Sequence, residues 1–388
     1  MRHRYKLRCG GNAPIFLSEH RLHGATDFEK RLEGSLRSTS SLLIAFSAGL
    51  LGAAGVQPVA ATPESRAAVL FLLIEPGARA SGMGESYVAL ADDATASYFN
   101  PAALAGQENR SLNFTHMKWL PALADDLSYE FVAFSQPVPS WGGNIGINAA
   151  LLNLGEQTRT DERGTVQGTF SSYDFSVSAA FGSSISDNLA AGIGLKFIRS
   201  SLADQGAGIE RGKGVGSSFA VDLGVLWKAT PQLNLGAALR NMGPKITFID
   251  ASQADPLPQH IVLGVAYDLL DTEFHDMLLS FDVYKPLIAN GYFASNLVKA
   301  WGDESFSDEF NEIDLHVGGE YRYGLSTQQD QSFLALRAGY SYDDDGELKT
   351  PTFGLGLKYD HFQVDVAYIT GDNSPLQDNT RFSLNIDF

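Results

Sequence analysis

Hydrophobic and polar residues alternate along most of the chain that follows residue 110. The last eight residues, RFSLNIDF, place an apolar side chain at every second position from Phe382 to Phe388, with polar residues between them. The segments HFQVDVAYIT (residues 361–370) and SSFAVDLGVLW (residues 217–227) repeat the pattern. Because successive side chains of a β-strand point to opposite faces, a period of two predicts strands with one apolar face each.

Fourteen such segments follow one another, and most have the length that a tilted strand needs to cross a bilayer. Their approximate bounds are 111–119, 128–137, 142–154, 171–182, 189–200, 217–228, 233–242, 259–269, 276–285, 313–323, 332–342, 352–359, 361–369 and 380–388. In a soluble sandwich or propeller the apolar faces would point inward. In an outer-membrane barrel they would point outward to lipid.

The connections between the segments distinguish these two architectures. Those after the second, fourth, sixth and twelfth segments are tight. Those after the third, fifth, seventh and ninth are long, at about 155–170, 201–216, 243–258 and 286–312. Short periplasmic turns and long outer loops are typical of outer-membrane barrels. The sequence therefore predicts an all-β fold, a 14-stranded antiparallel transmembrane β-barrel over residues 111–388, with both ends of the barrel on the periplasmic side.

Aromatic residues lie near the ends of the predicted strands, among them Trp119, Trp141 and Trp227. Amphipathic rings suit the two membrane interfaces, so we expect the wall to contact outer-membrane lipid and lipopolysaccharide. Phe388 ends the last strand and resembles the terminal aromatic signal that barrel assembly machinery reads. The acidic run DDDGE, residues 343–347, is interpreted as a solvated outer turn, with calcium binding or divalent bridging to lipopolysaccharide as alternatives.

The first 61 residues have the features of a leader and secretory signal peptide. The apolar stretch of residues 40–61 follows Arg31 and Arg37 and ends in Val59-Ala60-Ala61, whose small side chains suit signal peptidase. The single cysteine, Cys9, lies in this region, so the expected mature chain has neither disulfides nor cysteine-based metal sites. The net charge of −17 argues against nucleic acid as a partner.

Residues 62–110 lie between the leader and the first strand, and we interpret them as a plug. The apolar run of residues 67–74 is too short to cross a bilayer as a helix. A fourteen-stranded lumen is wider than wall side chains alone can fill. Asn100 before Pro101 has the pattern of a helix N-cap followed by proline at the first helical position.

Charged residues in the same segment suggest contacts with the wall. Arg79 is expected to pair with Asp92, Asp93 or a wall acid such as Asp222. Adjacent residues of an extended segment point to opposite faces, so Asp92 and Asp93 are not expected to act as a catalytic pair. The eight histidines form no zinc-binding pattern such as HExxH, and no nucleophile–base motif occurs. We therefore expect neither an enzyme nor a bound metal or cofactor.

Several motifs together resemble the PorV/PorQ family. They are Gly77-Ala78-Arg79, Met83-Gly84, VALADDATASYFNPAALA from Val88 to Ala105, and RNMGPKITFIDASQADPLPQHIVLGVAY from Arg240 to Tyr267. The resemblance implies an outer-membrane barrel of the FadL-like fold that is associated with type IX secretion. It marks a plug motif that consists of Gly77, Arg79, Met83, Gly84, Asp92, Asp93, Asn100 and Pro101.

The longest outer loop, residues 286–312, mixes acids with five aromatic residues. They are Tyr292, Phe293, Trp301, Phe306 and Phe310. Because large apolar surfaces are seldom left uncovered, these rings either fold over the barrel mouth or receive a partner. We take them as candidate cargo-docking residues.

The expected function is non-enzymatic. By the resemblance, the protein accepts exported cargo that carries a C-terminal signal domain and shuttles it at the outer membrane. The alternative is a FadL-like channel for long-chain fatty acids or other hydrophobic molecules, because barrels of that fold share the Asn-Pro-Ala element. A channel requires an apolar pocket between plug and wall. A secretion partner requires a sealed lumen and exposed apolar outer loops.

Overall fold

The computed structural model describes residues 67–161, 163–203, 213–288, 292–302, 305–325, 332–344, 346, 348–370 and 379–388. The leader and signal peptide predicted for residues 1–61 lie outside the described residues. Within the described ranges, no helix is long and apolar enough to cross a membrane.

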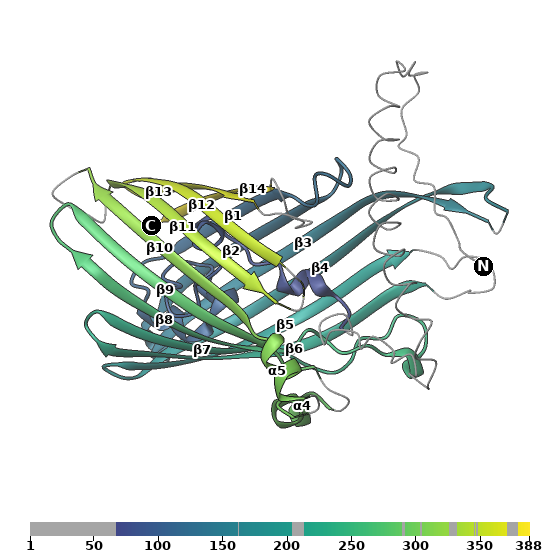
Figure 1. Cartoon of the computed structure of the whole chain (residues 1–388), viewed down its shortest axis with the longest axis horizontal. Coiled ribbons are helices and arrows are strands. Elements are labelled where there is room, and N and C mark those ends of the chain that lie inside the picture. The colour runs from purple at the N-terminus through teal and green to yellow at the C-terminus, as the bar shows by residue number, and fades with distance from the viewer. Residues whose placement is uncertain are drawn as a thin grey trace, which may run out of the picture. The chain divides into compact units, whose positions relative to one another are not determined.

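Fourteen antiparallel strands form a closed barrel (Figure 1). Each strand pairs with its neighbours in the sequence, and β1 pairs with β14 to close the wall. The strands are β1 Ser111–Lys118, β2 Ser128–Val138, β3 Gly143–Thr160, β4 Val166–Ser186, β5 Leu189–Ala203, β6 Gly214–Thr230, β7 Leu233–Met242, β8 His260–Asp271, β9 His275–Pro286, β10 Asp314–Gly324, β11 Ser332–Asp343, β12 Leu348–Tyr359, β13 Phe362–Ile369 and β14 Asn379–Asp387. All fourteen segments predicted from the alternation are strands.

Short helices precede the barrel and interrupt its connections. Between residue 67 and the first strand they are η2 Leu70–Leu73, α2 Ala78–Gly82, α3 Ala96–Phe99 and η3 Pro101–Gly106. Those between strands are η4 Pro139–Trp141, η5 Ala251–Gln253, α4 Phe293–Lys299 and α5 Phe306–Asn311. The helices α4 and α5 belong to the longest connection, at one end of the barrel (Figure 1).

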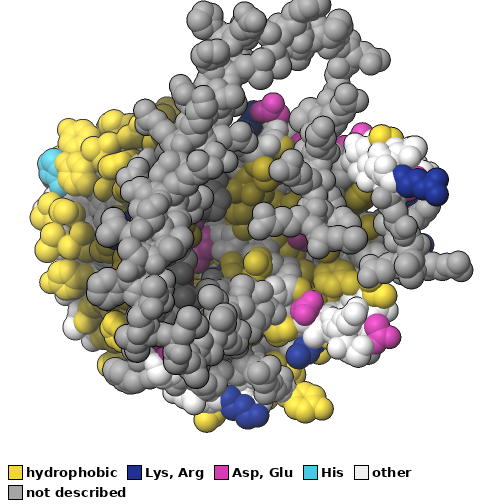
Figure 2. Space-filling model, turned by 45° about the vertical axis from the view of Figure 1, so that its right-hand side comes forward, with side chains coloured by type: hydrophobic (Ala, Val, Ile, Leu, Met, Phe, Trp, Pro, Cys, Tyr) yellow, Lys and Arg dark blue, Asp and Glu magenta, His cyan; other side chains and the backbone are white. Residues whose placement is uncertain are grey.

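The apolar faces of the strands point outward. On β12, Phe353, Leu355 and Leu357 are 54%, 62% and 47% exposed, whereas Thr352, which precedes them, and Arg337 on the neighbouring strand are buried. Figure 2 shows hydrophobic side chains gathered over the side of the barrel. A soluble sheet would bury this face, so the orientation excludes the sandwich and the propeller and defines a wall that faces lipid.

The prediction of a long loop at residues 155–170 is wrong. β3 continues to Thr160 and β4 begins at Val166, and their pairing runs from Glu156 opposite Ser171 to Thr160 opposite Val166. The residues here are polar on both faces, so they lack the apolar alternation that marks a strand in lipid. The two strands stay paired nonetheless, because the backbone hydrogen bonds between them form whether the side chains face lipid or water.

Candidate functional site

The N-terminal segment, which we define as residues 67–110, packs against the inner face of the wall (Figure 1). Its helix α2 contacts β11, β12, β13 and β14, while η3 contacts β3, β4, β5 and β6. Side chains that alternate away from lipid meet it directly. The Ala78 amide donates to Ser383 Oγ at 2.7 Å, and Asn148 Nδ2 donates to Ser97 Oγ at 2.9 Å. The inward face of the barrel thus forms the contact surface for this segment.

Glycines on the inner wall allow the backbone of the segment to approach closely. A Cβ on Gly192 would lie 2.3 Å from the carbonyl carbon of Pro101, and one on Gly339 would lie 2.0 Å from the Gly84 nitrogen. Neither distance is possible for a real side chain, so these two positions require glycine while the segment keeps its place. The wall is therefore shaped to the segment.

Arg79 is the centre of the largest buried ion-pair network. Its Nε and Nη2 donate to both carboxylate oxygens of Glu320, each at 3.0 Å, and its Nη1 donates to the Tyr87 hydroxyl at 2.9 Å and to Asp92. Glu320 also accepts from Arg322 at 2.8 Å and from Arg337 at 2.5 Å. This bidentate, desolvated geometry is the strong form of an arginine–carboxylate contact. It ties α2 to β10.

The network extends to further acids. Arg337 Nη1 donates to Asp365 Oδ1 at 2.8 Å, and Arg322 Nη2 lies 3.9 Å from Asp92 Oδ2. The three arginines therefore face three acids: Glu320, Asp365 and Asp92. The predicted partner Asp222 is not part of this network, because it pairs with Lys196 at 3.1 Å on the other side of the segment.

Asp92 and Asp93 both lie beside Arg79 and Tyr87, so the expectation that they point to opposite faces is wrong. The backbone bends at Asp93 and does not stay extended, which turns both carboxylates the same way. Asp93 accepts from the Tyr87 hydroxyl at 3.3 Å and from the Thr95 amide at 2.8 Å.

The two neighbouring acids have opposite electrostatic surroundings. Burial and the adjacent Asp92 carboxylate raise the pKa of Asp93. Partial desolvation disfavours the charged form of Asp92, whose side chain is about half exposed, but the guanidinium groups of Arg79 and Arg322 outweigh it and lower its pKa. This arrangement stabilises an ion pair, and it does not present two free carboxylates to a substrate.

Asn100 caps η3 and also fastens the segment to the wall. Its Oδ1 accepts from the Ala102 amide at 3.1 Å, and Pro101 occupies the first helical turn, as the sequence predicts. Its Nδ2 donates to the carbonyls of Val88 at 2.9 Å and Val225 at 3.1 Å. The second role does not follow from the capping pattern, because Val225 lies on β6.

The remaining motif residues shape the turn around α2. Gly77 precedes the helix with φ of 92°, and Gly84 follows it with φ of 65°, both in the region that favours glycine. The Gly84 amide donates to Thr352 Oγ1 at 2.9 Å, and Met83 is fully buried. The motif thus marks residues that pack the segment on the wall.

Several buried wall residues that hold the segment were missed by the sequence analysis. Arg381 donates to the Glu75 carbonyl at 2.8 Å, to Ser81 Oγ at 2.6 Å and to Glu85 Oε1 at 3.0 Å. Arg240 lies 4.0 Å from the Tyr98 ring centroid in a cation–π contact. The sequence held a signal for these residues. Both arginines stand at inward positions of strands with alternating apolar and polar residues, and a charge at such a position needs a partner inside the barrel.

The candidate docking aromatics lie at the outer mouth, in and beside α4 and α5. Tyr292, Phe293, Trp301 and Phe310 are 86%, 41%, 54% and 65% exposed. The side chain of Phe306 lies outside the described residues. These four side chains are thus accessible from solvent, and docking of cargo on them stays a prediction.

A pocket of about 500 Å³, which we call the mouth pocket, lies between α4 and the β7–β8 connection. Its lining includes Tyr292, Phe293, Leu257, Gln259 and Asn296. Gln259 and Asn296 are buried, and their Nε2 and Oδ1 atoms have no hydrogen-bond partner among the described residues. A buried donor and a buried acceptor in an apolar pocket are complementary to a ligand that carries both functions.

The C-terminus closes the wall next to the start of β1. The Phe388 amide donates to the Arg110 carbonyl at 2.9 Å, and the Arg110 amide donates to the Phe388 carbonyl at 3.1 Å. The Phe388 ring is 54% exposed on the outer face of the barrel. A partner that reaches the last strand can therefore contact it.

A closed fourteen-stranded wall with an apolar exterior and a polar, charged interior defines the class of outer-membrane β-barrels. A family model described as type IX secretion system protein PorV matches residues 61–291. The chain belongs to this family and is an outer-membrane protein.

Solved structures agree with the fold. A toluene transporter of Pseudomonas putida, TodX, is similar with a TM-score of 0.51 and 12% identity, over 81% of this chain and 99% of the other. A FadL homologue of Pseudomonas aeruginosa has a TM-score of 0.49 and 11% identity, over 81% and 98%. At 12% identity, the similarity to TodX shows that the fold is a FadL-like barrel and shows nothing about function. The chain has no match among curated proteins.

Proposed function

We propose that the protein is a non-enzymatic cargo acceptor of type IX secretion, with a lumen plugged by the N-terminal segment and a docking surface at the outer mouth. The family that the chain belongs to motivates the secretion role. The observation that carries the proposal is the mouth pocket with its exposed aromatic rim.

The plug is supported by the way in which the segment is held. Its charged side chains are paired with charges of the wall, and removing the segment would take Arg79 away from Glu320 and two backbone amides away from Asp282. Asp282 Oδ2 accepts from the amides of Tyr87 and Val88 at 2.8 and 2.9 Å. A gate that opens to pass a hydrophobe would have to break such desolvated contacts, which is costly.

The mouth pocket suits a peptide. Each main-chain amide offers one N–H donor and one C=O acceptor, which complement Asn296 Oδ1 and Gln259 Nε2. Aromatic side chains in interfaces contribute much of the binding free energy, and Tyr292 and Phe293 stand beside the two amides. We infer that a segment of the cargo's C-terminal signal domain enters this pocket.

Replacing Tyr292 and Phe293 together by serine should reduce surface display of a C-terminal-signal cargo at least tenfold, because two aromatic anchors are lost. Gln259→Leu should give a smaller loss. Display is measured by labelling of intact cells, with barrel folding checked by heat-modifiable gel mobility. The control is Tyr359→Ser, an aromatic residue that is 71% exposed but lies beside the β12–β13 turn at the other end.

Uptake of a long-chain hydrophobe by the same cells separates this proposal from the FadL-like channel. If the variant at Tyr292 and Phe293 displays cargo normally but no longer takes up the hydrophobe, cargo docking is rejected and a transport function is favoured. Unchanged display together with unchanged uptake would reject the mouth pocket as the docking site.

A further inference from the structure

A polar pair interrupts the apolar outer wall close to the seam where β1 meets β14. His116 Nδ1 lies 2.7 Å from Glu130 Oε1, and the two side chains are 55% and 47% exposed. Both stand at outward positions, since the alternating neighbours Thr115 and Phe131 are buried. Ionisable groups on a lipid-facing surface are disfavoured in a depth-dependent way, so their presence indicates a specific partner.

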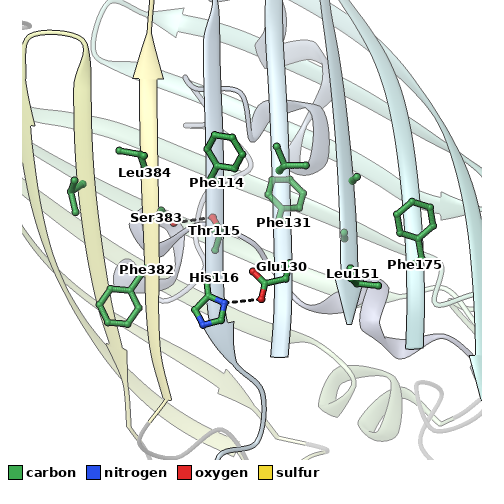
Figure 3. A pocket seen from close by; sticks show the side chains of 14 residues that line it. Phe114, Thr115, His116, Glu130, Phe131, Leu151, Phe175, Phe382, Ser383 and Leu384 are labelled. Carbon is green, nitrogen blue, oxygen red and sulfur yellow. Dashed lines mark hydrogen bonds and ion pairs between the residues drawn. The ribbon is translucent and has the colours of Figure 1, made fainter. Parts of the chain in front are cut away.

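The pair belongs to a shallow groove of about 470 Å³, which we call the seam groove (Figure 3). Across the strands, Phe382, His116, Glu130, Leu151 and Phe175 form one row. Figure 3 shows His116 and Glu130 joined in the middle of this row, with rings or aliphatic side chains on both sides. The polar pair is therefore enclosed laterally by apolar residues.

The next row of the seam groove is apolar throughout. It consists of Leu384, Phe114, Val132 and Ala149. Ala149 is the small member of this row, and it leaves the hollow between Val132 and the bulky Leu151 and Phe175. This row lies nearer the periplasmic end of β1, and the polar pair lies nearer the outer end. The groove is thus amphipathic along the membrane normal.

That polarity matches a lipid of the outer leaflet, whose chains point to the midplane and whose polar linkages lie above them. The pair uses one imidazole nitrogen and one carboxylate oxygen, so His116 Nε2 and Glu130 Oε2 can meet a ligand. Hydrocarbon cannot satisfy such atoms. A hydroxyl or an amide can, because each donates and accepts a hydrogen bond and so suits either state of the imidazole.

We propose that the seam groove binds one outer-leaflet lipid whose acyl chain carries a hydroxyl or amide near its headgroup end, the acyl chemistry of lipopolysaccharide. The apolar row holds the chain, and the His116–Glu130 pair holds the hydroxyl or amide. This assignment is independent of the proposed cargo function, because the groove lies on the outer wall and not at the mouth.

The test is native mass spectrometry of the protein extracted from outer membranes in mild detergent, with hydroxylated fatty acids quantified per barrel. The wild type should retain lipopolysaccharide. His116→Leu combined with Glu130→Leu should reduce retention roughly tenfold or more, because the two hydrogen bonds to the lipid are lost. Ala149→Phe should give a similar loss by filling the hollow while leaving the polar pair intact.

The matched control is Ala237→Phe. It fills a second outward groove of about 420 Å³ on β6 to β9, whose lining has no charged residue, and it should leave retention unchanged. Equal retention of lipopolysaccharide in all variants would overturn the proposal. So would a wild type that retains only phospholipid, or variants that lose a co-purifying protein while they keep their lipid. If a variant fails to fold, titrating delipidated wild type with lipopolysaccharide and with phosphatidylethanolamine decides the matter, because equal binding of the two would reject the site.

Discussion

Glu320 receives three arginines, two from the wall and one from the N-terminal segment. Its side chain is 1% exposed, and burial alone would disfavour its charge. The surrounding guanidinium groups make the ionised form tenable, as expected for a buried charge with complete pairing. The residue thus couples the segment to β10, β11 and, through Arg337, to Asp365.

Glu320→Gln should destabilise the folded barrel by about 3–5 kcal/mol, since it leaves buried arginines without their partner. The unfolding temperature in detergent, followed by heat-modifiable gel mobility, measures the change. Glu156→Gln, on the exposed extension of β3, is the control and should have little effect. A shift of equal size in both variants would contradict the role assigned to the network.

Two acids of the N-terminal segment should respond to pH in opposite directions. Burial, and then the nearby Glu85 carboxylate, raise the pKa of Glu75. Above about pH 4 the Glu75 carboxyl keeps its proton in the folded state but releases it in the unfolded chain. Glu75 therefore lowers the free energy of unfolding as the pH rises. The lowered pKa of Asp92 has the reverse effect, because its contribution is present above about pH 4 and is lost on acidification.

Glu75→Gln should accordingly raise the unfolding temperature at pH 7 but not below about pH 4, while Asp92→Asn should lower it at pH 7 and not in acid. Asp92 is 55% exposed, so its effect should be the smaller one. The measurement is the unfolding temperature of each variant against wild type across this pH range. Shifts of the same sign at pH 7 would contradict the assignment.

At the scale of elements, the fit between η3 and the wall depends on backbone contact. η3 contacts four consecutive strands, β3 to β6, and the inward glycines of this region remove the side chains that would hold it away. The same device recurs on the opposite side, where Gly82 lies against Gly354. Two short elements thus pack closely against opposite sides of the inner wall.

Gly192→Ala and Gly339→Ala should loosen the N-terminal segment, because each new methyl group would collide with its backbone. Trypsin should then cleave near Arg79 in the folded variants, whereas the wild type stays protected. Gly106→Ala is the control, because nothing lies within 4 Å of its added Cβ. Protection of Arg79 in both wall variants would show that the segment does not depend on these contacts.

At the scale of the whole molecule, closure is made by strands from the two ends of the barrel sequence. β1 pairs with β14 from Ser111 opposite Asp387 to Met117 opposite Arg381. Because lipid cannot satisfy an unpaired sheet edge, this seam must form before or during insertion. Phe388 pairs with Arg110 at the end of this seam.

We propose that barrel assembly machinery reads the Phe388 ring. Deleting Phe388 should reduce the amount of folded protein in the outer membrane severalfold, and Phe388→Ala should reproduce most of that loss. Phe388→Tyr keeps the ring and should restore assembly. Quantitative immunoblotting of outer-membrane fractions measures the outcome, and full assembly of the deletion variant would remove the argument for the signal.

The wall could be predicted from the alternation of apolar and polar residues alone. Alternation gave fourteen strands within a few residues of their observed ends, because lipid on one side and polar groups on the other impose a period of two. The cap at Asn100 was also local, since a cap needs only the next few residues. The extension of β3 and β4 was missed because it lies where neither face meets lipid.

Which charged residues pair could be read only from the folded arrangement. The sequence offered several acids as partners of Arg79, and its bidentate partner, Glu320, stands 241 positions away. Likewise, Ala149, His116 and Glu130 form one groove only because three strands lie in one register. The local alternation determines which face of the sheet a side chain occupies. Pairing between distant residues depends instead on the relative positions of separate elements, and these are set when the barrel closes around the N-terminal segment.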